Sequence, residues 1–322
     1  MGWAVSMAYW CMVSDEIQHI RSTAMPITDS KKRAIVILAG HPGEEKTWQE
    51  VNREAQGCME EARAQVSGHS HRRGVFPTLR DGVSHGGGQT EPMNHSNHPK
   101  KAKILKNLNS QRCFRRIAGF GSCKLTRLSA LGFNQLKSLV SAVFRTWAPK
   151  LYEYYDSTLG RLFKSDPTLR RPFNSIFTAV TYNLGPKTAC FPHVDFANLA
   201  FGYCAITAIG EYDSELGGHL VLHDLELVIQ FPAGSTILVP SAIIKHSNTA
   251  IRKGEKRYSF TQYCAGGLFR WVDNGCKAAK EYWASLNEGE KVARERSDKE
   301  RWEFGLNLLP VLGDMKKIEK NT

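Results

Sequence analysis

The cysteines of this 322-residue chain are scattered, and no two of them form a C-x-x-C pair. That absence argues against a structural zinc site and against a redox dithiol, and eight isolated thiols are typical of a reducing compartment. The chain also lacks an apolar run of the roughly 18 residues that a membrane span needs. Its N-terminus has no basic stretch ahead of an apolar one, which argues against a secretory signal. We therefore expect an intracellular protein with no membrane partner.

Acidic side chains are nearly missing from residues 100–172. This segment carries 16 basic and 3 acidic side chains, whereas residues 1–99 carry 10 and 11 and residues 173–322 carry 17 of each, so the net charge of +12 resides in it. Lysine and arginine that displace counterions supply most non-specific nucleic-acid affinity, so the segment is a candidate nucleic-acid partner surface. A solvated helix face is the alternative. Three lysines (Lys100, Lys101, Lys103) also suggest nuclear import.

Composition and periodicity divide the chain into five segments. Residues 1–33 show no periodicity and predict a loosely held arm. Residues 34–99 predict a short buried strand, an amphipathic helix over residues 46–65 and then a Gly- and His-rich loop. Residues 100–172 are basic and helical, with Pro149 dividing two helices because a proline inside a helix removes a hydrogen bond. Residues 173–275 predict the β-rich catalytic core, and residues 276–322 predict a helical extension.

Residues 173–275 change to the period of β-strands. Short runs rich in β-branched and aromatic residues are separated by glycine and proline, and they cover residues 176–183, 190–195, 201–209, 219–222, 225–231, 235–240, 242–247 and 257–263. Such runs predict an antiparallel double sheet of the jelly-roll type. The expected fold class is therefore α+β, with a double-stranded β-helix (jelly-roll) core and flanking helices.

His193, Asp195 and His246 are the candidate metal ligands. His193 and Asp195 are two residues apart on a predicted strand, so their side chains share a face, and His246 lies on the last predicted strand but one. A His-x-Asp triplet often occurs by chance, but this is the only His-x-Asp or His-x-Glu in the chain. Two histidines and one carboxylate with the remaining positions open are the ligands with which non-haem iron(II) binds a cosubstrate and dioxygen. The pattern predicts these three residues as catalytic iron ligands.

Arg257 and Ser259 are the candidate cosubstrate-binding residues. They share a face of the final predicted strand, after His246. An arginine forks two hydrogen bonds onto a carboxylate, and a nearby hydroxyl can add a third. A dicarboxylic cosubstrate such as 2-oxoglutarate needs such a partner at its distal end. His219 and His223 are interpreted as surface or satisfied core histidines. Four polar residues near strand ends either line the pocket or serve packing, namely Tyr182, Asn183, Asn198 and Gln262.

Several stretches together resemble the iron(II)/2-oxoglutarate-dependent dioxygenase superfamily. They are residues 182–188, 193–198, 217–222, 231–241, 246–248 and 257–263. With residues 264–271 added, the chain resembles more narrowly the large group found in mushroom-type fungi and related to the TET/JBP nucleic-acid dioxygenases, many members of which accompany transposons. The resemblance covers residues 34–275. It implies iron(II) held by His193, Asp195 and His246, and 2-oxoglutarate held by Arg257 and Ser259.

The sequence leaves three functions open. The first is a dioxygenase that uses dioxygen to oxidise the methyl group of a modified base in DNA or RNA, with the base flipped out and residues 100–172 gripping the backbone. The second is a dioxygenase of a protein or a small molecule, in which the basic segment is only a solvated face. The third is a non-catalytic nucleic-acid-binding jelly roll, against which the intact ligand set argues. Fold alone does not choose among them, and no motif assigns an oligomeric state.

Overall fold

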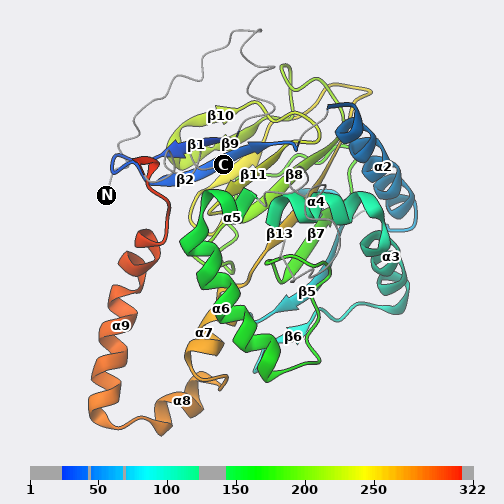
Figure 1. Cartoon of the computed structure of the whole chain (residues 1–322). Coiled ribbons are helices and arrows are strands. Elements are labelled where there is room, and N and C mark those ends of the chain that lie inside the picture. The colour runs from blue at the N-terminus through cyan, green and yellow to red at the C-terminus, as the bar shows by residue number, and fades with distance from the viewer. Residues whose placement is uncertain (1–23, 43–44, 68–69, 123–142, 314–322) are drawn as a thin grey trace, which may run out of the picture.

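The computed structural model describes residues 24–42, 45–67, 70–122 and 143–313. Its largest sheet contains β1 (Met25–Thr28), β2 (Ala34–Gly40), β5 (Thr78–Ser84), β6 (Met93–Asn94), β7 (Ala179–Asn183), β8 (Cys204–Glu211), β11 (Thr236–Val239) and β13 (Lys256–Tyr263). Their order across the sheet is β1-β2-β11-β8-β13-β7-β5-β6, and every pairing is antiparallel (Figure 1). The fold is therefore built on an antiparallel sheet to which strands far apart in sequence contribute.

Two smaller antiparallel sheets accompany the large one. The first has the order β10-β9-β12 and consists of β9 (Leu220–Leu222), β10 (Leu227–Ile229) and β12 (His246–Asn248). The second pairs β3 (Ser70–His71) with β4 (Gly74–Val75). Isolated bridges join the loop between β7 and β8 to both larger sheets, because Lys187 pairs with Arg257 on β13 and His193 pairs with His246 on β12. That loop therefore lies where the two larger sheets meet.

The helices are α2 (Glu45–Ala64), α3 (Pro99–Ser110), α4 (Arg112–Ser122), α5 (Val143–Trp147), α6 (Pro149–Ser165), α7 (Gly266–Asp273), α8 (Ala279–Ser285) and α9 (Glu288–Asn307), with a short 3₁₀ helix η1 (His223–Leu225). The predicted amphipathic helix is confirmed as α2, whose buried stripe is Trp48, Val51, Ala55, Met59 and Ala62. The predicted break at Pro149 is also confirmed, since α5 ends at Trp147 and α6 begins at Pro149. None of the helices in the described ranges is both long enough and apolar enough to cross a membrane.

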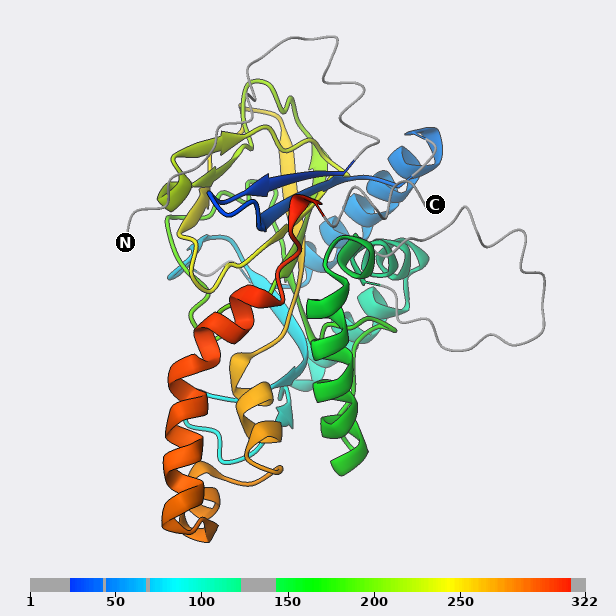
Figure 2. The same ribbon diagram turned by 60° about the vertical axis from the view of Figure 1, so that its left-hand side comes forward.

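Helices α2, α3 and α4 cover one face of the large sheet (Figures 1 and 2). The ring of Phe114 on α4 lies 4.9 Å from that of Tyr182 on β7 and 5.4 Å from that of Phe260 on β13, measured between centroids. The Tyr182 hydroxyl donates to Asn109 Oδ1 of α3 at 2.7 Å. Because successive strand residues alternate between faces, the residues next to Tyr182 and Phe260 point to the opposite face. One of these neighbours is Ser259.

Helices α6, α7 and α9 run close together at one end of the molecule (Figures 1 and 2). The ring of Tyr154 on α6 lies 5.4 Å from Phe269 of α7 and 5.5 Å from Phe304 of α9. The C-terminal segment is therefore helical in its described part, as predicted, and aromatic contacts attach it to the rest of the fold.

Three sequence expectations are wrong. The arm prediction fails for its last part, because β1 pairs with β2 and packs Met25 and Ile27 against the core; residues 1–23 lie outside the described ranges. The prediction of a Gly- and His-rich loop before residue 100 fails at β5. This strand buries Leu79 and Val83, although an Asp and a Gly lie between these two apolar residues. The strand prediction fails for residues 190–195, which form an irregular loop with a single bridge to β12, and for residues 242–245, which form a turn ahead of β12.

Candidate metal centre

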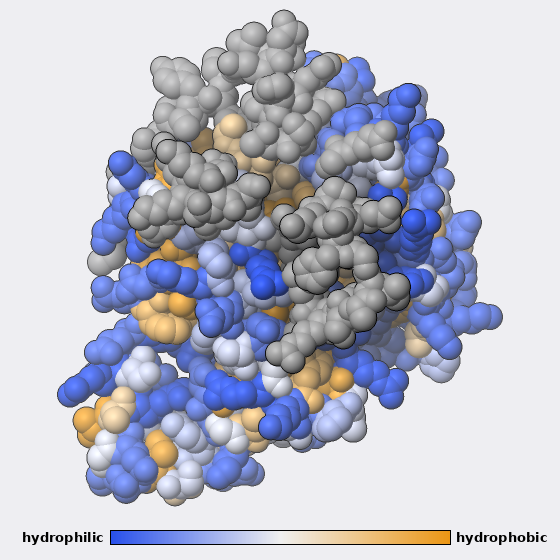
Figure 3. Space-filling model, viewed as in Figure 1, coloured by the Kyte–Doolittle hydropathy of each residue, from blue (hydrophilic) through white to orange (hydrophobic). Residues whose placement is uncertain are grey.

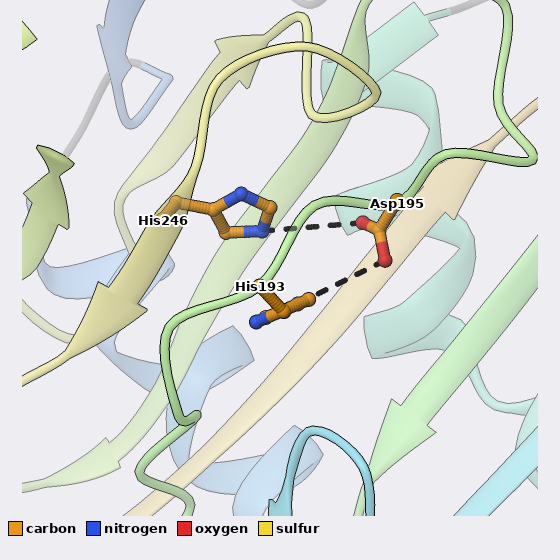
Figure 4. Close-up of side chains that lie close together, drawn as sticks. All are labelled: His193, Asp195 and His246. Atoms are coloured by element: carbon orange, nitrogen blue, oxygen red, sulfur yellow. Dashed lines mark ion pairs between the residues drawn. The ribbon is translucent and has the colours of Figure 1, made fainter. Parts of the chain in front are cut away.

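His193, Asp195 and His246 point toward one another from two separate segments (Figure 4). His246 is the first residue of β12, whereas His193 and Asp195 belong to the loop between β7 and β8. The His193 N–H donates to the His246 carbonyl at 3.0 Å, and the His246 N–H donates to the His193 carbonyl at 2.9 Å. This reciprocal pairing sets the two imidazole centroids 4.3 Å apart. The main chain, rather than side-chain contact alone, positions the pair.

The distances within this triad fit one ion between three donors. His193 Nε2 lies 3.8 Å from Asp195 Oδ1, and His246 Nε2 lies 3.9 Å from Asp195 Oδ2. These separations are too long for direct hydrogen bonds. The candidate ligand atoms all lie within 4.8 Å of one another, and within the described ranges this is the one group of three His, Cys, Asp or Glu side chains that is so arranged. The triad can therefore surround a single metal ion.

Hydrogen bonds fix the tautomer of both histidines. His193 Nδ1 lies 2.7 Å from the Phe191 carbonyl, and His246 Nδ1 lies 2.9 Å from the Ile244 carbonyl. A carbonyl can only accept, so each Nδ1 carries the proton and each Nε2 presents a lone pair toward Asp195. Burial, followed by the charge of His246, lowers the pKa of His193 to about 4. The imidazole of His193 is therefore neutral at physiological pH, as a metal ligand must be.

Arg257 has a buried guanidinium with no carboxylate partner among the residues that the structure describes. Arg257 is 1% exposed, and its guanidinium carbon lies 5.9 Å from the ring centroid of Tyr212 and 5.8 Å from that of Phe231. It donates from Nη1 to the Thr188 carbonyl at 2.7 Å, while its Nε has no hydrogen-bond partner in the described part of the chain. Burying a charge without an opposite charge costs several kcal/mol. An anion that accepts two hydrogen bonds from Arg257 would offset that cost.

Ser259 and Asn183 supply polar groups beside Arg257 on the same face of the sheet. The two residues are register partners on β13 and β7, and Asn183 Nδ2 donates to Ser259 Oγ at 2.8 Å. Asn183 Oδ1 is buried and has no hydrogen-bond partner among the described residues. Burial raises the pKa of the nearby Cys190 thiol, and the positive charges of Arg257 and Arg73 oppose that rise.

Comparisons with known proteins give remote structural matches only. No protein-family model matches the chain, and no curated protein matches it. The chain is similar to 2-oxoglutarate/iron(II) oxygenases of known structure. NgTET1 in complex with 5mC DNA has 13% identity and a TM-score of 0.48 over 77% of this chain and 80% of that chain.

Two further solved structures are similar to parts of the chain. A 2OG-Fe(II) oxygenase family protein from Burkholderia pseudomallei has 16% identity and a TM-score of 0.33 over 69% of this chain and 90% of that chain. The 2OG complex of a viral collagen prolyl hydroxylase from Paramecium Bursaria Chlorella virus-1 has 13% identity and a TM-score of 0.22 over 33% of this chain and 68% of that chain. The sequence identity to all three structures is low.

The four polar residues predicted near strand ends lie on different sides of the large sheet. Asn183 lies on the Ser259 side, and Asn198 lines a cavity next to Asp195. Tyr182 and Gln262 lie on the other face, where Gln262 Oε1 accepts from Ser175 Oγ at 2.9 Å. The two other histidines of this region are occupied away from the triad, because His219 pairs with Thr249 and His223 pairs with Ser247.

Helices α3 and α4 of the basic segment do not border the metal centre. Helices α3 and α4 pack on the face of the sheet that carries Tyr182 and Phe260, opposite the face of Ser259. Their exposed basic residues include Lys100, Lys101 and Lys103. Figure 3 shows the edge where α2 and α3 lie as mostly hydrophilic. The sequence prediction assigned the binding of the nucleic-acid backbone to this segment, of which residues 123–142 lie outside the described ranges, but within the described ranges other cations lie next to the centre.

Those cations are Arg72, Arg73 and Arg80, which sequence reasoning missed. Arg73 Nη1 lies 3.6 Å from Asp195 Oδ1. All three arginines line the cavity next to Asp195. The only sequence signal was a pair of arginines inside a stretch interpreted as loop, and nothing in the sequence linked that stretch to Asp195.

Proposed function

We propose that this protein is an iron(II)- and 2-oxoglutarate-dependent dioxygenase with a double-stranded β-helix core, and that it oxidises a methylated nucleobase in DNA or RNA. The observation that carries the proposal is the convergence of His193, Asp195 and His246 on the side of the sheet that carries the buried Arg257, which has no carboxylate partner within the described ranges. The core would extend over residues 173–275, joined by β2 and β5, with residues 276–322 as an extension.

The three ligands would be His193 Nε2, His246 Nε2 and a carboxylate oxygen of Asp195. They fit iron(II) because both imidazoles are held by their Nδ1 protons and both lone pairs face the carboxylate. Three donors on one side leave positions for 2-oxoglutarate and dioxygen. When bound, iron(II) with these two partners supplies the oxidising power to hydroxylate a C–H bond.

Arg257 would hold the distal carboxylate of 2-oxoglutarate. Its fork can donate two parallel hydrogen bonds, and the Ser259 hydroxyl can donate another. Burial strengthens these contacts, because water does not compete for the guanidinium. Tyr212 and Phe231 keep the arginine in place from its sides. The protein would thus orient the cosubstrate before the chemical step.

Oxidation of a nucleobase is supported by the sequence resemblance to the TET/JBP group and by the arginines next to Asp195. Residues 100–172 would add general affinity for a long nucleic acid, with α3 and α4 acting from the far face of the sheet. The alternative is a dioxygenase of a protein or a small molecule. A non-catalytic nucleic-acid-binding module would not need a neutral His193 facing a carboxylate.

The test is mass spectrometry of methylated DNA and RNA after incubation with the protein, iron(II), ascorbate and 2-oxoglutarate. The proposal predicts oxidised bases with the wild type and none with Asp195→Ala. His98→Ala is the matched control, because His98 is exposed at the start of α3 and should leave turnover unchanged. Turnover of 2-oxoglutarate without any oxidised base, alongside a hydroxylated protein substrate, would favour the alternative.

A further inference from the structure

A cavity of about 190 Å³ opens next to Asp195, and its lining is strongly basic. Arg72, Arg73 and Arg80 contribute to it, whereas Asp195 is the one carboxylate among its lining residues. Sites that enclose a whole small molecule usually measure about 300–1,000 Å³. A smaller, basic cavity suits one anionic group of a larger ligand.

Two separate segments bring the arginines together. Arg72 and Arg73 form the turn between β3 and β4, and the Phe191 N–H donates to the Arg73 carbonyl at 2.8 Å. This bond ties the turn to the loop that carries His193 and Asp195. Arg80 lies on β5 opposite Thr181 of β7, and both residues line the cavity. The cavity therefore belongs to the same face of the sheet as Ser259.

The arginines have more positive charge than their surroundings neutralise. Arg73 contacts Asp195 only at 3.6 Å, and its Nη2 is buried without a hydrogen-bond partner in the ranges that the structure describes. Arg72 and Arg80 are exposed and take part in no ion pair within those ranges. A bound metal would also compete for the charge of Asp195. An anion with several oxygens would satisfy this cluster through charge-assisted hydrogen bonds.

Exposed aromatic rings stand beside the cavity. Phe196 directly follows Asp195 and is 74% exposed, and the Arg72 guanidinium carbon lies 5.3 Å from its ring centroid. Phe191, two residues before His193, is 51% exposed. Proteins that bind single-stranded nucleic acid combine a basic groove for the backbone with aromatic rings on which bases stack. A carboxylate ligand would account for the arginines but not for the exposed aromatic ring beside them.

We propose that this cavity is a nucleotide-binding site, in which the arginines bind a backbone phosphate and Phe196 stacks with a base. The inference rests on the proposed function, which it deepens by naming a single-stranded or flipped-out nucleotide as the substrate. In a duplex both faces of a base are stacked on its neighbours, so only an unstacked base has a face free for Phe196. Strand opening or base flipping is then required before the base reaches the metal centre.

The experiment measures binding of a fluorescent single-stranded oligonucleotide to the full chain by anisotropy, over a range of salt concentrations. For the double variant Arg72→Ala with Arg80→Ala, we expect Kd to rise at least tenfold and the slope of log K against log salt to fall by about 0.7 for each phosphate that the variant no longer neutralises. Phe196→Ala should raise Kd about tenfold, because stacking on one aromatic ring contributes about 1–3 kcal/mol per base. Thermal melting verifies that each variant is folded.

The double variant Arg296→Ala with Lys299→Ala is the matched control, because both residues are exposed on α9 and their removal lowers the net charge by two, as that of Arg72 and Arg80 does. Its Kd should match that of the wild type. The site is wrong if the cavity variants bind as the wild type does, if the double cavity variant weakens binding no more than this control, or if an unlabelled duplex or an acidic peptide competes better than the unlabelled single strand.

Wild-type conversion of 2-oxoglutarate to succinate without nucleic acid tests the proposed function separately. If the wild type binds the oligonucleotide through these arginines but converts no 2-oxoglutarate, the activity is wrong and the binding site stands. If the wild type converts 2-oxoglutarate but the cavity variants bind normally, the binding site is wrong and the activity stands.

Discussion

The main chain of His193 is bridged to that of His246 by two hydrogen bonds of 3.0 Å and 2.9 Å, although one residue lies in a loop and the other begins β12. The imidazoles of both are also held at Nδ1 by carbonyls of their own segments. None of these bonds requires a metal. The centre is therefore preorganised, and we expect the chain to fold without the ion.

Asp195→Ala should abolish stoichiometric iron(II) binding and leave the fold intact. The change removes the one carboxylate of the triad but none of the backbone bonds that place the histidines. Anaerobic titration should give one ion per chain for the wild type and no saturable binding for the variant. The melting temperatures of the metal-free proteins should agree within a few degrees, roughly the shift that 1 kcal/mol produces in a chain of this size. Equal iron affinity in the two proteins would exclude Asp195 as a ligand.

Arg257→Met should weaken 2-oxoglutarate binding while keeping most of the volume between Tyr212 and Phe231. Losing a buried charge partner typically costs about 2–5 kcal/mol. The KM for 2-oxoglutarate, measured by succinate formation, should therefore rise at least about thirtyfold. The control is Arg252→Met, because Arg252 is exposed and paired with Glu255. An unchanged KM in Arg257→Met would place the cosubstrate elsewhere.

Gly82→Ala should destabilise the fold, and Gly57→Ala should not. Gly82 on β5 has φ +107°, and an added Cβ would collide with the Thr178 carbonyl oxygen. The backbone would have to shift, at a cost of about 1–3 kcal/mol or more. Gly57 lies within α2 with open space around it, so alanine should add roughly 0.5–1 kcal/mol of stability through its helix propensity. Urea denaturation gives both free energies of unfolding, and a neutral Gly82→Ala would argue against the described path of β5.

Replacing Lys100, Lys101 and Lys103 by glutamine should separate general affinity from turnover. These lysines lie on α3, on the opposite face of the sheet from the triad. We expect weaker, less salt-dependent binding of long DNA or RNA, and unchanged kcat/KM on a short single-stranded oligonucleotide. A large decrease of kcat/KM on the short substrate would mean that α3 reaches the substrate at the centre.

The sequence predicted those elements whose pattern is local. The stripe of α2 and the break at Pro149 follow from helical period and proline chemistry alone. The prediction that His193, Asp195 and His246 lie close together is confirmed, but the reason given for it was partly wrong. His193 and Asp195 were placed on a strand, but they lie in a loop whose backbone bridge to His246 does the positioning. Such a bridge joins residues distant in sequence and leaves no local pattern.

The missed features depend on pairing across the chain. β1 has only four residues and contains a proline, and β5 contains an Asp and a Gly. Both become strands because they pair with the backbones of β2 and β7. The charge count of residues 100–172 was correct, but a count cannot tell which face of a sheet α3 and α4 will cover. Arg72, Arg73 and Arg80 were missed because the β3–β4 turn and β5 approach Asp195 only in the folded chain.

Succinate formed from 2-oxoglutarate by the purified full chain with iron(II), ascorbate and dioxygen shows whether the triad is the metal centre of a dioxygenase. We expect turnover that requires iron(II), stops on chelation and is restored by added iron(II). It should be absent in His193→Ala, Asp195→Ala and His246→Ala but present in His98→Ala. Wild-type turnover that persists without iron(II), or in any of the three triad variants, would contradict it.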